Sequence, residues 1–167
     1  AAHRRQRDPH AHRHVAHQVG GEDERAGHHR HEDEVVVAVL VNVSKKSLFT
    51  VEERMEMLRE IVAPYPNIRV DSFAGLLVDY CATHNISAII KGLRAVSDFD
   101  YELQMAQMNQ RLSGIDTFFI STSPQYSFLS SSLVREVGRF GGDVSTMVPA
   151  SVATRLVERF AEQGSPS

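Results

Sequence analysis

A run of seven apolar residues, from Val35 to Val41, constrains the fold of this chain more than any other feature. A strand with one face in water alternates apolar and polar residues, whereas a strand covered on both faces reads as a continuous apolar run. Strands of the second kind belong to parallel sheets with helices on both faces. We therefore predict a central strand over residues 35–41 in a single α/β domain with a doubly wound parallel sheet.

The rest of the chain alternates strand and helix, as such a sheet requires. Thr50 and Glu53 form a capping box at the start of a helix, and Asp98 begins a longer one whose apolar stripe contains Phe99, Leu103, Met108 and Leu112. Gly114 is its expected stop. The predicted helices cover residues 50–62, 73–84, 98–113, 130–140 and 151–162, and the further predicted strands cover 68–70, 86–90 and 117–120.

The first 33 residues differ in composition from all that follows. They contain eight of the nine histidines and almost no large apolar side chain. Such a segment cannot bury enough surface to order itself. We therefore predict three parts: residues 1–33 as an atypical, disordered segment, residues 34–162 as the folded domain, and residues 163–167 as a tail.

Charge and composition exclude several classes of protein. A formal net charge of −3 gives no general attraction for nucleic acid or an anionic membrane. The longest apolar run is far shorter than the roughly 20 residues of a membrane span, and the sequence shows no signal peptide. We expect a cytoplasmic protein without nucleic-acid or membrane partners. Cys81, the one cysteine, lies in an apolar helical pattern and is expected to be a buried thiol.

Two cations lie where a buried strand is expected to leave the sheet. They belong to the run Ile90, Lys91, Gly92, Leu93, Arg94. Ligands of open α/β sheets bind at this carboxyl end. Lysine offers a mobile charge, arginine a fork for two phosphate oxygens, and glycine a close approach of the backbone. The alternative is a strand end whose lysine and arginine are merely solvated.

A serine-rich segment precedes a predicted helix. It consists of Tyr126, Ser127, Phe128, Leu129, Ser130, Ser131 and Ser132. Three serines at a helix start gather hydroxyls and unpaired N–H groups at one anion-binding point. An ordinary serine N-cap would explain one of the three.

Two weaker features accompany these segments. Lys45 and Lys46 follow the first predicted strand across a short turn, although paired surface lysines are usually solvated. Glu102 and Asn109 lie seven residues apart on one helix and share a face, so both could point at a ligand over the sheet.

Taken in order, the segments Asn42 to Lys46, Ile90 to Arg94, Asp98 to Asn109 and Tyr126 to Glu136 resemble the bacterial phosphopantetheine adenylyltransferases. The resemblance covers residues 34–160. It implies a Rossmann-like fold and transfer of an adenylyl group from ATP to 4′-phosphopantetheine, giving dephospho-coenzyme A and pyrophosphate in coenzyme A biosynthesis. It further implies Mg²⁺ as cofactor and a homohexamer as the assembly.

The resemblance also implies site residues, by their positions in the motifs. Lys45, Leu77 and Lys91 match residues that hold phosphopantetheine, with Lys45 at the reacting phosphate. The matches to ATP-binding residues are Gly92, Leu93, Arg94, Glu102 and the seven residues Tyr126 to Ser132. The motifs identify no catalytic residue and no metal ligand on the protein.

The chain departs from the family at its N-terminus. The family begins with a strand and a loop whose threonine and histidine contact the reacting phosphates, and here only Asp8, Pro9 and His14 echo that loop. Our hypothesis is that residues 1 to about 32 reflect a gene start read in the wrong frame. Without the first strand a buried sheet edge would be unpaired, so we expect a poorly stable or inactive chain.

Two other interpretations remain. A chain lacking the threonine and histidine loop could bind ATP or coenzyme A without catalysing, as a nucleotide-binding module of the same fold. The histidines at positions 10, 12, 14, 28, 29 and 31 could ligate Zn²⁺ or Ni²⁺, although no fixed geometry is evident.

Overall fold

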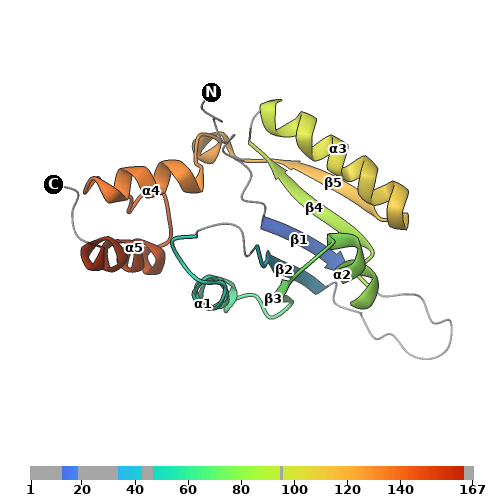
Figure 1. The fold of residues 1–167 in the computed structure, drawn as a ribbon, viewed down its shortest axis with the longest axis horizontal. Helices are drawn as coiled ribbons and strands as arrows, with labels where there is room; N and C mark the ends of the chain where they lie inside the picture. The colour runs from blue at the N-terminus through green and yellow to red at the C-terminus, as the bar shows by residue number, and fades with distance from the viewer. Residues whose placement is uncertain (1–12, 19–33, 43–46, 95, 164–167) are drawn as a thin grey trace, which may run out of the picture.

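A computed structural model of the chain describes residues 13–18, 34–42, 47–94 and 96–163 (Figure 1). Their strands form one five-stranded sheet with the order β3-β2-β1-β4-β5. β2 pairs in parallel with β3, and β4 pairs in parallel with β5. The predicted α/β class is confirmed, with helices between the parallel strands.

The strands and helices have the following bounds. The strands are β1 (Arg13–Gln18), β2 (Glu34–Leu40), β3 (Ile68–Phe73), β4 (Ala88–Leu93) and β5 (Asp116–Ser121). The helices are α1 (Val51–Val62), α2 (Leu77–Thr83), α3 (Val96–Ser113), α4 (Ser131–Arg139) and α5 (Ala150–Glu162), with a short 3₁₀ helix, η1 (Pro124–Tyr126).

β1 is the largest departure from the sequence analysis, which expected no ordered element before residue 34. It lies in the middle of the sheet, antiparallel to β2 and to β4, with Val15 opposite both Val37 and Ile90. The facing edges of β2 and β4 carry backbone N–H and C=O groups that need partners when buried. The expected unpaired edge is therefore absent, since β1 fills it. The hypothesis that residues 1 to about 32 reflect a gene start read in the wrong frame stays a prediction.

The two faces of the sheet are covered by different helices. Asp71 on β3 accepts a hydrogen bond from Tyr80 of α2 at 2.7 Å, while the next residue back, Val70, faces the hollow bordered by α1. Because side chains alternate along a strand, α1 and α2 lie on opposite faces. α3 covers β4 and β5, where Phe99 meets Phe119 edge-on at 5.8 Å.

The core lies mainly between the sheet and α2. Its most buried members include Val36, Ile89 and Cys81. Cys81 is a free, buried thiol, as predicted, and its burial raises the pKa of the thiol to about 11. This cluster fixes the strands whose ends carry the candidate site.

α4 and α5 form a second packed unit beyond the sheet, beside α1 (Figure 1). Val134, Val144 and Leu156 are its buried centre. Arg155 of α5 pairs with Glu56 and Glu60 of α1 at 2.8 and 2.5 Å. The packing joins α4 to α5, and the ion pairs hold α5 beside α1.

Several element boundaries were predicted correctly because their signals are local. The capping box of Thr50 and Glu53 is present at α1, and Gly114 ends α3 with a φ of +76°. Asn85 has the left-handed φ of 53° expected at the end of α2.

Other boundaries and orientations were wrong. β4 runs to Leu93 rather than ending at Ile90, and α2 begins at Leu77 rather than at residue 73, so that Leu76 precedes the helix and is exposed. Two residues of the predicted apolar stripe of α3, Met108 and Leu112, are exposed. Among the described helices, none is long and apolar enough to cross a membrane.

Candidate active site

The candidate site lies at the sheet edge where β2, β4 and β5 end. Leu93 at the end of β4 stands opposite Ser121 at the end of β5. β1 links this pair to β2, since its residues pair with both strands. Arg13, the first residue of β1, is opposite Val39, so the reversed strand begins at this same edge.

Lys91 and Glu102 form a buried ion pair beneath this edge. Lys91 is 6% exposed and Glu102 is 8% exposed, and Lys91 Nζ lies 3.4 Å from Glu102 Oε2. Burial lowers the pKa of Lys91, an effect opposed by the nearby Glu102 carboxylate. The structure thus joins a residue predicted to hold phosphopantetheine to one predicted to hold ATP.

Arg94 connects the end of β4 to the serine-rich segment. Its Nη1 donates a hydrogen bond to the Leu129 carbonyl at 2.7 Å, between residues 35 apart in the sequence. The Thr122 N–H donates to the Leu93 carbonyl at 2.9 Å, which extends the contact beyond β5. Two segments predicted separately to bind phosphate therefore meet at one place.

The serines at the start of α4 have different roles. Ser130 is the N-cap, and its hydroxyl accepts a hydrogen bond from the Leu133 N–H at 3.1 Å. Ser131 and Ser132 are exposed in the first turn. An N-cap explains Ser130 alone, so two further hydroxyls remain at the positive end of the helix dipole.

The segment before these serines presents aromatic rings to solvent. Tyr126 ends η1 and Phe128 follows it, and both are exposed. Ser127 donates its hydroxyl hydrogen to the Pro124 carbonyl at 2.9 Å, which tightens this turn. Exposed rings beside an anion-binding helix start suit a ligand with both a flat base and phosphates.

The glycine of the motif lies close to a neighbouring strand end. A Cβ at Gly92 would lie 3.6 Å from the Thr122 hydroxyl oxygen, which is an ordinary contact. The backbone at Gly92 therefore does not require glycine for space within the described chain. The lack of a side chain at Gly92 would instead let a ligand approach the backbone closely at the strand end.

The remaining predicted residues differ in burial, and two of them are not described by the structure. Leu77 lies in the core cluster and is largely covered, whereas its neighbour Leu76 is exposed. Asn109 is buried on the face of α3 that also carries Glu102, which confirms that the two share a face. Lys45 and Lys46 lie outside the described residues.

A cavity of about 460 Å³ lies near the end of β2, between Asn42 and the residues from Ser47 to Val51. Asn42 and Arg159, which are far apart in the sequence, both line this cavity. Arg159 stacks over the Phe49 ring at 5.1 Å and donates to the Leu48 carbonyl at 2.9 Å. Sequence reasoning missed Arg159, because nothing local signals that α5 returns to this edge.

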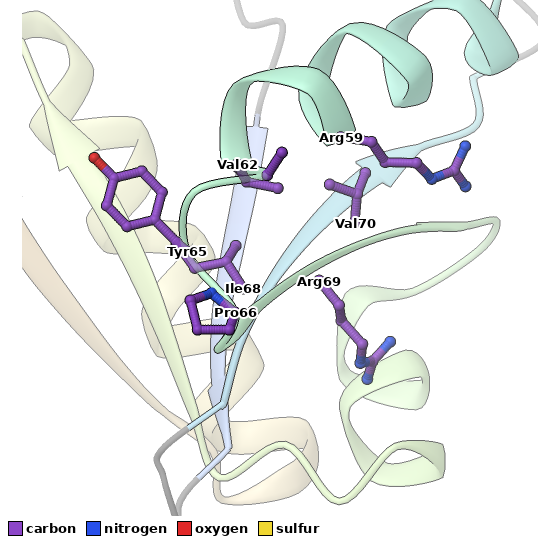
Figure 2. Close-up of a pocket in the computed structure, with 8 residues that line it drawn as sticks. Arg59, Val62, Tyr65, Pro66, Ile68, Arg69 and Val70 are labelled. Atoms are coloured by element: carbon purple, nitrogen blue, oxygen red, sulfur yellow. The ribbon is translucent and has the colours of Figure 1, made fainter.

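A second hollow, of about 380 Å³, lies at the opposite edge of the sheet (Figure 2). It is bordered by Arg59 and Val62 of α1 and by Ile68 and Val70 at the start of β3. Ligands of open α/β sheets bind at the carboxyl edge. The hollow at the start of β3 is therefore not assigned to the candidate site.

The architecture is that of an α/β protein in which parallel strands end beside two cations and a serine-rich helix start. A family model described as cytidylyltransferase-like matches residues 23–137, which places the chain among the nucleotidyltransferases.

Curated relatives narrow this class. The chain is 59% identical over 130 residues to the phosphopantetheine adenylyltransferase of Thermobifida fusca (strain YX), covering 78% of this chain and 79% of that protein. It is 62% identical over 128 residues to the same enzyme of Streptomyces coelicolor, covering 77% and 80%. For the enzyme of Frankia casuarinae the values are 60% over 134 residues, covering 78% and 83%. The chain belongs to the phosphopantetheine adenylyltransferase family.

Proposed function

We propose that this chain transfers the adenylyl group of ATP to 4′-phosphopantetheine, giving dephospho-coenzyme A and pyrophosphate. The observation that carries the proposal is the contact of Arg94 with the segment that leads into α4. This contact joins the two motifs predicted to bind phosphate at the carboxyl edge of the sheet. The relatives of the chain are named as phosphopantetheine adenylyltransferases.

The reaction requires positioning rather than a nucleophile from the protein. A phosphate oxygen of 4′-phosphopantetheine attacks the α-phosphorus of ATP, and the bond from that phosphorus to the pyrophosphate oxygen breaks. Groups that align the two phosphates and stabilise spread negative charge are sufficient. Lys91, Arg94 and the first turn of α4 provide cations and N–H donors of the required kind.

The proposed binding residues divide between the two substrates. Lys45, Leu77 and Lys91 hold phosphopantetheine in this proposal. Gly92, Leu93, Arg94, Glu102 and residues 126–132 hold ATP. The exposed Tyr126 and Phe128 rings offer flat surfaces for the adenine, and Ser131 and Ser132 offer donors to the phosphates.

Mg²⁺ enters this proposal with the nucleotide. Among the described residues no group of three or more acidic, histidine or cysteine side chains could hold a metal ion. The edge presents cations, hydroxyls and N–H groups, a donor set that suits the phosphates of Mg-ATP and not a bare ion. When bound, Mg²⁺ neutralises charge on those phosphates.

A homohexamer and a cytoplasmic location complete the proposal, and both follow from the family resemblance. The hexamer is tested by light scattering of the purified chain, in which a mass other than six chains would contradict it. The alternative of a module that binds nucleotide without catalysis is not favoured, since the relatives are named as enzymes.

The site is tested by measuring ATP affinity with calorimetry for the unaltered chain and for Arg94→Gln. A charged hydrogen bond contributes about 1.5–3 kcal/mol, so the variant should bind about 10- to 100-fold more weakly. Arg139→Gln, at the exposed far end of α4, is the matched control and should bind as the unaltered chain does. Equal affinity of all three proteins would place ATP elsewhere.

A further inference from the structure

Arg159 of α5 contacts the segment that leads from β2 into α1. Its Nη1 donates a hydrogen bond to the Leu48 carbonyl at 2.9 Å, between residues 111 apart in the sequence. Its guanidinium carbon lies 5.1 Å from the centroid of the Phe49 ring. Its Nη2 donates to Oε1 of Glu53 in the first turn of α1. One side chain near the C-terminus therefore holds three consecutive points of the path into α1.

Glu53 extends this network to the backbone where α1 begins. Its Oε2 accepts a hydrogen bond from the Thr50 N–H at 2.7 Å, and its own N–H donates to the Thr50 hydroxyl at 3.2 Å. The Thr50 N–H holds the pKa of the Glu53 carboxyl below its usual value, and Arg159 lowers that pKa further. Glu53 is therefore ionised at neutral pH, with one oxygen bonded to α5 and the other to the start of α1.

The segment held by Arg159 lies at the sheet edge that carries the candidate site. Asn42, just past the end of β2, and Leu48 both line the cavity that Arg159 also lines. Lys45, a proposed phosphopantetheine residue outside the described part of the chain, is three residues from each of them in the sequence. Three residues of extended chain span about 11 Å at most. The positions of Asn42 and Leu48 therefore limit where the chain between them can lie.

We propose that Arg159 is a positioning residue for 4′-phosphopantetheine: it holds the segment from Ser47 to Thr50 at the sheet edge and does not itself contact the substrate. The inference rests on the proposed reaction and adds to it a residue of the last helix. Arginine suits this role, because its planar guanidinium donates in two directions while its face stacks on a ring. When only part of the population holds the segment in place, the apparent affinity falls with that fraction.

The proposed ATP residues are supported by other contacts. They lie at the end of β4, on α3 and in residues 126–132, and Arg94 joins the first of these to the third through the Leu129 carbonyl. Loss of Arg159 leaves this bond in place. The inference therefore predicts a selective effect on one of the two substrates, which a general loss of stability would not produce.

Arg155 provides a matched control on the same helix. It lies one turn before Arg159 and pairs with Glu56 and Glu60 of α1 at 2.8 and 2.5 Å. Within the part of the chain that the structure describes, its ion pairs go to these two residues alone. Arg155→Gln therefore removes ion pairs between α5 and α1, as Arg159→Gln does, but leaves the contact with Leu48 and Phe49 intact.

Calorimetry with each substrate alone tests the proposal in the full chain. Arg159→Gln should weaken binding of 4′-phosphopantetheine about 10-fold, the effect of one charged hydrogen bond, and change ATP affinity less than about two-fold. Arg159→Lys keeps the charge without the planar fork and should show an intermediate loss. Arg155→Gln should bind both substrates as the unaltered chain does. In steady-state kinetics, Arg159→Gln should raise the KM for 4′-phosphopantetheine by a larger factor than it lowers kcat.

Three results would overturn the proposal. They are an unchanged affinity of Arg159→Gln for 4′-phosphopantetheine, an equal loss in Arg155→Gln, and an equal loss for both substrates. If Arg159→Gln does not give the far-ultraviolet spectrum of the unaltered chain, the comparison of Arg159→Lys with Arg155→Gln decides by the same criteria. An unaltered chain that binds both substrates but forms no product would contradict the proposed reaction alone, since the positioning of 4′-phosphopantetheine is measured by binding.

Discussion

Replacing Lys91 with methionine removes one charge from a buried pair and leaves the other without its partner. Both side chains are more than nine-tenths buried, and their charged atoms lie 3.4 Å apart. Breaking a buried pair by removing one member typically costs 3–5 kcal/mol, because the remaining charge stays desolvated. We therefore expect Lys91→Met to lower the free energy of unfolding by about 3–5 kcal/mol.

The double variant Lys91→Met with Glu102→Leu separates packing from charge. Replacing a whole buried pair by apolar residues of similar volume is often neutral or stabilising. We expect the double variant to recover most of the stability lost in Lys91→Met, as measured by urea unfolding at pH 7.5 followed by circular dichroism. Neither variant should transfer adenylyl groups, since both lack the proposed phosphopantetheine ligand.

Two results would refute this reasoning. A loss below about 1 kcal/mol in Lys91→Met would mean that water reaches Glu102 and that the pair is not buried in solution. A double variant whose loss equals the sum of the two single losses would mean that Lys91 and Glu102 do not interact. Either result would remove the link between the two substrate sites.

Three further predictions concern the support of the site. Ser130→Ala removes the N-cap of α4 and should cost about 1 kcal/mol in a urea unfolding experiment, whereas an unchanged midpoint would argue against the cap. Burial and the Asp71 carboxylate raise the pKa of Tyr80 from 10 to about 12, so the stability from its hydroxyl is present below pH 10 and is lost as the pH rises through 12. Tyr80→Phe should cost about 1.5–3 kcal/mol at pH 8 and much less at pH 12, and an equal cost at both pH values would contradict this. Cys81 should resist thiol reagents until the chain unfolds, and rapid labelling of the native protein would show that the core is open.

Much of the fold follows from signals that are local in the sequence. The capping box of Thr50 and Glu53 and the glycine after α3 set their helix ends through contacts within a few residues. The apolar run at β2 marks a strand covered on both faces. These features could be predicted because each is complete within one short stretch of chain.

β1 could not be predicted from its own sequence, because the interactions that order it come from other parts of the chain. The segment Arg13–Gln18 has neither an apolar run nor a strong strand composition. It is a strand because β2 and β4 both present edges that need hydrogen-bond partners. Sequence patterns indicate the conformation that a segment favours by itself. The conformation of β1 is set instead by hydrogen bonding to the neighbouring strands β2 and β4.

The candidate site was predicted in pieces but not in its connections. Lys91, Arg94 and the serines were identified from short motifs. The pair of Lys91 with Glu102 and the bond from Arg94 to Leu129 join residues on different elements, so they appear only in the folded chain. The apolar stripe of α3 was predicted from its periodic spacing, but periodicity does not say which neighbour covers a face, and Met108 and Leu112 are exposed.

The most direct test of the account is the identification of products from the full chain with Mg-ATP and 4′-phosphopantetheine. Mass spectrometry and a pyrophosphate assay should detect dephospho-coenzyme A and pyrophosphate in equal amounts, with neither formed when one substrate is omitted. A chain that binds both substrates and forms neither product would contradict the proposed transfer and leave a nucleotide-binding module of the same fold.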